Sequence, residues 1–347
     1  MPRRPFVAVI LACGLLLAPG DSRVATRGSG GLSPVLSDRD FWQLSVDASE
    51  PSGYFRSDNL TSNELQFQYV IPELMSRTRQ GRVYLGVGPE QNFTYIAAVR
   101  PSMAVIFDIR RANLQLQLMY KALFEMAGDR AEFVSLLFSR PEPPGTGPDS
   151  TVTELMSRLP EMPESRAAYA QNLKAIDDRL TRTHHFPLTP EDLDGIEHVY
   201  EAFYASGYRV RYSPTYDDLM TATDEAGVHR SYLATEASFA FMKDLESRNL
   251  VVPVVGDFGG PKAIRHVAAY LKAHNATVSA FYLSNVEQYL DGKALQFCRN
   301  VQSLPLDASS TFIRSSSRSV GGFGYGYGRG FVSSLGGIAD EVRTCHD

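Results

Sequence analysis

The 347-residue chain lacks a block of basic residues beyond its first few positions, and its formal net charge is −5. Proteins that bind nucleic acid normally present a basic patch, so nucleic acid is not an expected partner. Hydrophobic residues make up 44% of the chain and charged residues 21%. This composition is typical of a globular protein with an ample core.

The sequence also lacks an apolar run long enough to span a membrane. Its N-terminal run, residues 6–18, is shorter than a transmembrane helix and follows Arg3 and Arg4. This pattern predicts a secretory signal that is removed before Thr26, followed by a flexible linker over residues 26–38. Residues 10–13 weakly resemble a lipoprotein box, but the apolar residues after Cys13 argue against a lipid anchor. We therefore expect an exported protein, periplasmic or secreted, with no stable membrane span.

Cysteine is scarce, and only Cys298 and Cys345 remain once the leader is removed. In an exported chain two cysteines permit one disulfide or two free thiols. We predict the bridge, which would tie the C-terminus back across a glycine-rich tail at residues 319–347. Histidines in metal-binding spacing are also lacking, because His184, His185 and His198 match no helix-borne pair. We therefore predict no metal site.

The most informative stretch is residues 81–93. Residues 82–87 read as a buried strand, Gly86 and Gly88 form a turn, and Pro89 fits the start of a helix. A second strand, residues 103–109, contains Asp108, which lies 108 − 88 = 20 residues after Gly88. At this spacing a carboxylate meets ribose hydroxyls in nucleotide-binding α/β domains.

This stretch lacks the third glycine of a dinucleotide fingerprint, since Gln91 stands there. Glu90 would also place a negative charge where a pyrophosphate should lie. Both features disfavour NAD and favour a ligand that is cationic at this end, such as S-adenosylmethionine. Asn92 belongs to the same loop and is a further candidate for ligand contact. Alternatively, Glu90 only complements the dipole of the helix that it starts.

Three more strands are expected at residues 250–255, 278–283 and 311–314. Asp257 follows the first of these, and Ser284 and Asn285 follow the second. Because ligands bind beyond the carboxyl ends of strands in open α/β sheets, we expect these residues to meet Gly88 and Asp108. The alternative is that strand ends attract Gly, Asp and Asn as turn formers. Arg110 and Arg111 lie at a strand exit, where one of them is a candidate for ligand contact. The alternative, which we favour, is that both are solvated charges.

The segments around this pattern carry further expectations. Before the first strand, Thr61 and Glu64 form a capping box for a helix, which leaves Asp58 and Asn59 as possible ligand contacts. A Pro/Gly-rich break at residues 141–148 separates residues 39–140 from a mainly helical insertion, residues 141–249, which is either a lid or a structural addition. Its clearest helix starts after Thr189 and stops at Gly207. Residues 250–318 complete the α/β domain, and the low-complexity stretch of the tail, residues 320–331, is expected to be disordered.

Residues 86–93, 108–111, 255–257 and 283–287 together resemble an uncharacterised bacterial family that is assigned to the S-adenosylmethionine-dependent methyltransferase fold. The resemblance covers residues 41–314. It implies a Rossmann-like, methyltransferase-type α/β fold with a mostly parallel sheet. The chain departs from the usual Gly-x-Gly-x-Gly loop, because Glu90 replaces the third glycine.

The resemblance implies a methyltransferase-like protein that acts on a small molecule or a protein. Residues 86–88 would hold the methionine part of the cofactor, Asp108 the ribose and Asp257 the adenine edge, while Ser284 and Asn285 would face the methyl acceptor. No catalytic base is evident, and methyl transfer can proceed by proximity and orientation. The alternative is an exported, non-catalytic binding protein, since S-adenosylmethionine is a cytoplasmic metabolite. If the chain binds an adenosine-containing ligand, we expect Asp108→Ala to weaken that binding without unfolding the chain.

Overall fold

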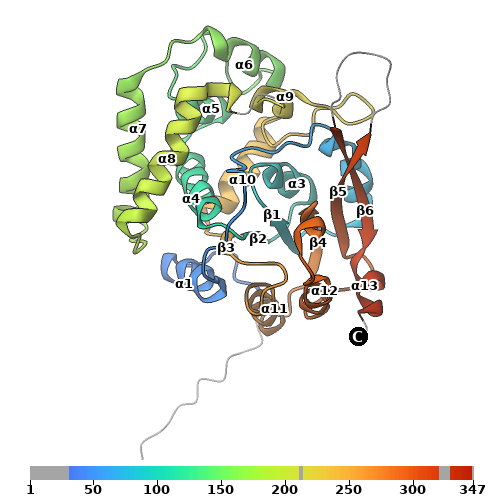
Figure 1. Cartoon of the computed structure of the whole chain (residues 1–347). Coiled ribbons are helices and arrows are strands. Elements are labelled where there is room, and N and C mark those ends of the chain that lie inside the picture. Colours follow the sequence, from blue (N-terminus) through green and yellow to red (C-terminus); the bar gives the residue numbers. More distant parts are fainter. Residues whose placement is uncertain (1–30, 211–213, 320–328, 346–347) are drawn as a thin grey trace, which may run out of the picture.

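The computed structural model describes residues 31–210, 214–319 and 329–345. They form an α/β fold around one six-stranded sheet in the order β3-β2-β1-β4-β5-β6 (Figure 1). The first five strands run parallel, and β6 is antiparallel to β5. The strands are β1 (Val83–Val87), β2 (Met103–Asp108), β3 (Val251–Val255), β4 (Val278–Ser284), β5 (Thr311–Ser319) and β6 (Arg329–Gly337). The predicted α/β class with a mostly parallel sheet is confirmed.

The central strands are buried on both faces, which explains why they are nearly continuous apolar runs. All six residues of β2 and all five of β3 are buried. β3 contains Pro253, which has no backbone N–H to donate. It is tolerated because β3 lies at the edge of the sheet. The Pro253 carbonyl accepts a 2.6 Å hydrogen bond from the Ser45 hydroxyl, so the neighbouring helix covers this edge.

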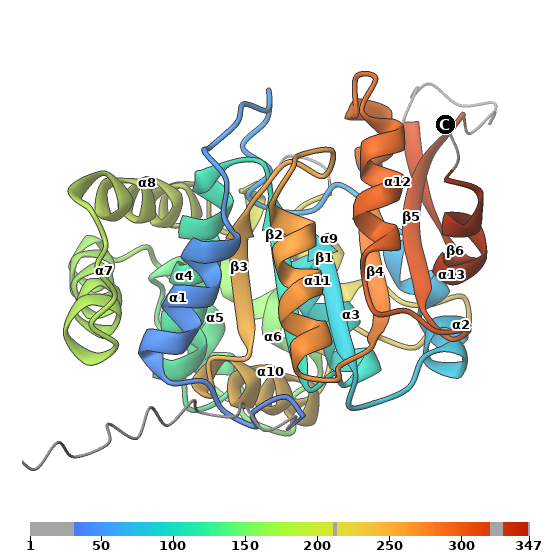
Figure 2. The same ribbon diagram turned by 90° about the horizontal axis from the view of Figure 1, so that it is seen from below.

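Helices cover both faces of the sheet (Figure 2). One layer contains α1 (Asp38–Ala48), α11 (Ala263–Ala273) and α12 (Ala294–Gln302). In this layer α1 packs on β3 and on α11, and α11 packs on α12. The other contains α2 (Ile71–Arg77), α3 (Gln91–Val99), α4 (Arg111–Met126) and α10 (Glu236–Ser247). Short 3-10 turns, η1 (Phe67–Val70) and η5 (Val286–Tyr289), lead into α2 and follow β4. The result is a three-layer arrangement with the sheet in the middle.

The long connection between β2 and β3 is helical, as predicted for residues 141–249. Beyond α4 it forms a helical subregion that packs on the far side of α4 (Figure 1). Its elements are α5 (Arg130–Phe138), α6 (Val152–Arg158), η2 (Leu159–Glu161), α7 (Arg166–Asp178), η3 (Arg179–Thr183), α8 (Pro190–Ser206), η4 (Gly207–Arg209) and α9 (Tyr216–Thr221). α8 begins as expected, with the Thr189 side chain accepting from the Asp192 amide. The predicted end of the insertion is displaced, because α10 packs against α3 and α4 rather than with the added helices.

The C-terminal region differs from the expected disordered tail. β6 pairs with the whole of β5, from Thr311 opposite Gly337 to Ser319 opposite Arg329. The chain then forms α13 (Ile338–Glu341) and η6 (Val342–Thr344). The expectation is wrong for residues 329–331, which begin β6, because backbone pairing to an open sheet edge does not depend on side-chain complexity. Residues 320–328 lie outside the described ranges, as does the proposed leader within residues 1–30.

Two predictions about the chain ends have clear outcomes. The Cys298–Cys345 disulfide is present, with a Cα–Cα distance of 5.8 Å, and joins α12 to the C-terminal turn. The expected flexible linker is shorter than residues 26–38. Leu36 is already buried, and its amide donates to the Arg248 carbonyl at 3.1 Å, so the ordered chain begins before α1.

His184 ties the helical subregion to the sheet domain. Its Nδ1 and Nε2 atoms each lie 2.7 Å from a carboxylate oxygen, of Asp38 in α1 and of Glu125 in α4. Burial lowers the pKa of His184, but its hydrogen bonds with Glu125 and Asp38 raise it more, so the net shift is upward. Two acceptor-only partners require an N–H on both ring nitrogens, which is the imidazolium form.

Over the described residues no histidine, cysteine or acidic cluster is arranged to hold a metal.

We expect this link to make stability pH-dependent. Because the folded-state pKa of His184 is raised above its unfolded value near 6.5, its stabilisation is complete below pH 6.5 and is lost as the pH rises through the folded pKa. His184→Gln should therefore remove part of the decline in unfolding free energy above pH 6.5. Urea denaturation of both proteins between pH 6 and 9 would measure this. Parallel pH profiles for the two proteins would contradict the assignment.

Candidate functional site

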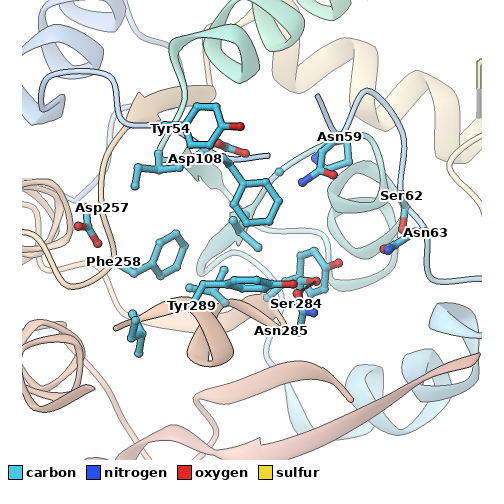
Figure 3. Close-up of a pocket in the computed structure, with 18 of the residues that line it drawn as sticks. Tyr54, Asn59, Ser62, Asn63, Asp108, Asp257, Phe258, Ser284, Asn285 and Tyr289 are labelled. Atoms are coloured by element: carbon cyan, nitrogen blue, oxygen red, sulfur yellow. Dashed lines mark hydrogen bonds between the residues drawn. The ribbon is translucent and has the colours of Figure 1, made fainter. Parts of the chain in front are cut away.

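A cavity of about 300 Å³ opens at the carboxyl ends of the central parallel strands (Figure 3). It is lined by residues 87–89 at the end of β1, 108–109 at the end of β2, 257–258 after β3, and by residues from 282 to 293 around the end of β4. β1 has β2 as its neighbour on one side and β4 on the other, so the strand order along the sheet changes direction at β1. Such a topological switch point is where open α/β sheets bind ligands.

The structure brings most of the predicted site residues into this cavity. Gly88, Asp108, Asp257, Ser284 and Asn285 line it, together with Asn59. The convergence follows from the parallel sheet, because the carboxyl ends of its strands meet at one edge. Gly86, Glu90, Asn92 and Asp58 are not among the lining residues.

Asn92 and Gly86 shape the turn after β1 instead of facing the cavity. The Asn92 amide donates to the carbonyls of Val87 at 2.9 Å and Pro89 at 2.7 Å, and its oxygen accepts from the Tyr84 hydroxyl at 2.9 Å. A Cβ atom on Gly86 would stand 1.8 Å from that oxygen. The expectation of ligand contact is therefore wrong for this pair, since side-chain-to-backbone bonds occupy the asparagine.

Glu90 is fully buried at the start of α3 and holds the segment that crosses over the strand ends. Its carboxylate accepts a 3.1 Å bond from the Ser62 amide. We call residues 49–66, which contain no helix or strand, the strap. Glu90 thus contacts the strap, and the expected direct contact with a ligand is not supported by its position.

The strap also contains the supposed capping box, which is not formed. The first helical turn after the strap begins only at Phe67. The Glu64 carboxylate instead accepts hydrogen bonds from the side-chain amide of Gln91 at 2.9 Å, from the Ser284 hydroxyl at 2.5 Å and from the Ser315 hydroxyl. These tertiary partners take the place of the local cap. Residues 54–63 of the strap supply one wall of the cavity. Among the described residues 141–210 and 214–249 none lines the cavity, so of the described chain the strap, and not the helical insertion, covers the site.

Asp108 is paired within its own strand exit. Its two carboxylate oxygens accept from Arg110, at 3.0 Å from Nε and 2.9 Å from an Nη atom, and from the Arg110 amide at 2.9 Å. Both side chains are 8% exposed, so the expectation of a solvated arginine is wrong for Arg110. Arg111 instead pairs with Asp192 at 2.5 Å. A carboxylate has about four acceptor positions, so Asp108 keeps one for a ligand, not the two expected for a ribose.

Arg110 also fastens the strap. Its second Nη atom donates to the carbonyls of Ser57, at 2.8 Å, and Asp58. Asp58 therefore contributes to this contact through its backbone carbonyl, while its side chain is exposed. The Asp108–Arg110 pair links the end of β2 to the cavity wall above it.

Asp257 stands at the opposite end of the cavity from Ser284 in Figure 3. Its carboxylate accepts from the Gly259 amide at 2.9 Å and from the Lys293 ammonium at 2.6 Å. The hydrogen bond to Asp257 raises the pKa of Lys293. Lys293 is the one lysine or arginine among the lining residues, and its charge is already matched.

Aromatic side chains form much of the remaining wall, and sequence patterns did not reveal them. They are Tyr54 and Phe55 of the strap, Phe258, Tyr282 and Tyr289. Phe55 meets Tyr289 edge to face, with ring centroids 5.1 Å apart. Tyr54 is 85% exposed at the mouth. The one available signal was the adjacent pair Tyr54 and Phe55 within a polar segment.

These features define an α/β protein with a small cavity of acidic and aromatic lining at the switch point of its sheet. The sequence matches the family described as domain of unknown function DUF7790 over residues 59–335, and the chain belongs to this family. No curated protein matches the sequence. Among the described residues, no helix is long and apolar enough to cross a membrane.

Proposed function

We propose that the chain binds an adenosine-containing ligand, with S-adenosylmethionine preferred, and acts as a methyltransferase-like protein on a small molecule or a protein. The observation that carries the proposal is the convergence of four strand ends on one cavity with acceptor carboxylates and aromatic faces. We also propose that the fold is of the methyltransferase type, and the mostly parallel sheet with its antiparallel edge strand supports this.

Cavity size and charge support this ligand over a dinucleotide. Ligand pockets span about 300–1,000 Å³, so a cavity of about 300 Å³ suits a single nucleoside better than two. Asp108, Asp257 and Asp291 line it, and its one lysine is paired. A pyrophosphate would meet net negative charge, whereas a sulfonium and an ammonium would be attracted.

The ligand would lie along the line of strand ends. The adenine would occupy the end at Asp257 and Phe258, where a ring face and a carboxylate are both available. One ribose hydroxyl would donate to the remaining acceptor position of Asp108. The methionine part would lie by Gly88, whose φ of 80° is a conformation that glycine adopts readily. The methyl group would then point toward Ser284 and Asn285, where proximity would promote transfer.

We expect calorimetric titration of the full chain to show S-adenosylmethionine or S-adenosylhomocysteine binding at least about tenfold more tightly than NAD. The reason is the loss of one or more charge-assisted contacts, about 1.5–3 kcal/mol each, when a pyrophosphate replaces a cationic group. Tight NAD binding would overturn the charge argument. Absence of binding by all three at millimolar concentration, with the fold intact, would exclude the adenosine ligand.

A second candidate, an exported non-catalytic binding protein, is favoured by one observation. The Cys298–Cys345 disulfide is a feature that persists in oxidising compartments and is rare in the cytosol. Export would separate the protein from cytoplasmic S-adenosylmethionine. N-terminal sequencing of the mature protein is expected to begin at or near Thr26. An intact leader on protein from the cytoplasm would remove this candidate's main support.

A further inference from the structure

The wall of the cavity at the end of β4 contains a buried carboxylate with no cationic partner. Glu64 is 1% exposed and lies directly behind Ser284. Its hydrogen-bond partners are the hydroxyls of Ser284, Ser315 and Tyr282 and the side-chain amide of Gln91. No lysine, arginine or histidine of residues 31–210, 214–319 and 329–345 forms an ion pair with it. Buried charges in proteins are normally paired. A positive charge is therefore the missing complement at this point of the site.

The hydrogen bonds around Glu64 fix the direction in which Ser284 presents its hydroxyl. Both carboxylate oxygens accept, one from Ser284 at 2.5 Å and the other from Gln91 at 2.9 Å and from Ser315. Since the Ser284 proton is directed to Glu64, only its lone pairs are available to the cavity. A ligand group at Ser284 must then be a hydrogen-bond donor. Carbonyls, carboxylates and phosphates do not meet this requirement.

The backbone at Ser284 supports a functional role. Its φ of 51° lies in the left-handed region, which a residue other than glycine seldom adopts. Such conformations cluster at ligand sites, where the surrounding structure maintains them. Ser284 lines the cavity along the same wall as Asn285 and Tyr289 (Figure 3).

Neighbouring side chains favour a charged donor over a neutral one. Tyr289 and Phe55 present aromatic rings to the cavity, and ring faces attract ammonium groups. Asp291 is a further carboxylate among the lining residues. The nearest lining ammonium, that of Lys293, is held by Asp257 at 2.6 Å and leaves the net charge negative.

We propose that the cavity has an amine subsite, in which a protonated amine donates to the Ser284 hydroxyl and the Glu64 carboxylate behind it supplies the counter-charge. This assignment rests on the proposed function in one respect: it identifies the methyl acceptor as an amine, which would give up a proton to solvent before its lone pair takes the methyl group and S-adenosylhomocysteine leaves. The subsite itself is defined without reference to the cofactor, so it is testable when the cofactor is absent.

Two probes of matched size and opposite charge test the subsite on the full chain. 2-Phenylethylammonium offers an N–H donor, a positive charge and a ring, whereas 3-phenylpropanoate offers only acceptors and a negative charge. Calorimetric or NMR titration is expected to show the ammonium probe binding at least about tenfold more tightly, as the loss of one charge-assisted bond implies. Equal affinity of the two probes would overturn the proposal.

The chain offers a matched pair of variants for the serine. Ser284→Ala and Ser315→Ala each remove one hydroxyl bond to Glu64, but only Ser284 lines the cavity. Ser284→Ala is expected to weaken the ammonium probe about tenfold. Ser315→Ala should change its affinity by less than about twofold. Equal losses in both variants would mean that the hydroxyls serve only to hold Glu64, and the subsite would be rejected.

Glu64→Gln keeps the size of the side chain and removes its charge, so it should abolish the preference for ammonium over carboxylate. Unchanged discrimination by a folded Glu64→Gln protein would contradict the role of the carboxylate. If this variant does not fold, the serine pair decides. Titration of the same proteins with S-adenosylmethionine tests the proposed function separately. If S-adenosylmethionine does not bind, the proposed cofactor is rejected. The amine subsite is decided only by the relative affinities of the ammonium and carboxylate probes.

Discussion

Replacement of Asp108 by alanine is expected to destabilise the protein by about 3–5 kcal/mol, as measured by urea denaturation. The carboxylate and its partner Arg110 are both 8% exposed, and their oxygens and nitrogens lie 2.9 Å apart. Removing one member of a buried pair leaves an uncompensated buried charge, which carries a cost of this size. The variant also frees the arginine that holds the strap carbonyls of Ser57 and Asp58.

The double variant Asp108→Ala/Arg110→Ala is the control for this explanation. It removes both charges, so it should be more stable than Asp108→Ala alone, and a double-mutant cycle should report a favourable coupling between the two side chains. Additive effects of the single variants would contradict a buried pair. The expectation that Asp108→Ala would leave the fold unaffected is therefore withdrawn, and loss of ligand binding in this variant alone does not measure a ribose contact.

Loss of the Cys298–Cys345 disulfide is expected to cost about 4 kcal/mol. The two cysteines are 47 residues apart, and closing a loop of that length removes this much entropy from the unfolded chain in the loop-closure account. The loop includes β5 and β6, so the bridge restrains the strand hairpin that completes the sheet edge. Denaturation of Cys298→Ser/Cys345→Ser beside the wild type would measure the difference.

Reductant provides the control for this prediction. The wild-type protein should fall to the stability of the double serine variant when a thiol reductant is added, whereas the variant should not respond. A wild type whose denaturation midpoint is the same with and without reductant would show that the bridge does not contribute to stability.

Much of the fold was determined by local sequence patterns. Strands β1 to β4 were predicted to within one or two residues, because buried parallel strands are dense in β-branched and apolar residues. α8 was predicted from its capping residue Thr189. From these strands the position of the cavity followed, since their carboxyl ends meet at one edge.

What the patterns missed depends on contacts between distant segments. Glu64 matches a capping box, yet its carboxylate bonds to Ser284 and Ser315, 220 and 251 residues away. The antiparallel strand β6 has a sequence typical of a disordered tail, but the open edge of β5 supplies backbone partners that no local pattern reveals.

The sequence by itself determined the α/β class, the order of the strands along the chain and the capping of α8, all of which depend on local patterns. It also determined which strand ends carry Gly88, Asp108, Asp257 and Ser284. The tertiary structure alone decided which of these side chains remain open to a ligand. Asp108 is largely occupied by Arg110, and Asn92 by the turn that it closes. The physical reason is that buried polar groups form hydrogen bonds within the protein, and the packing of segments far apart in the chain decides which partners are within reach.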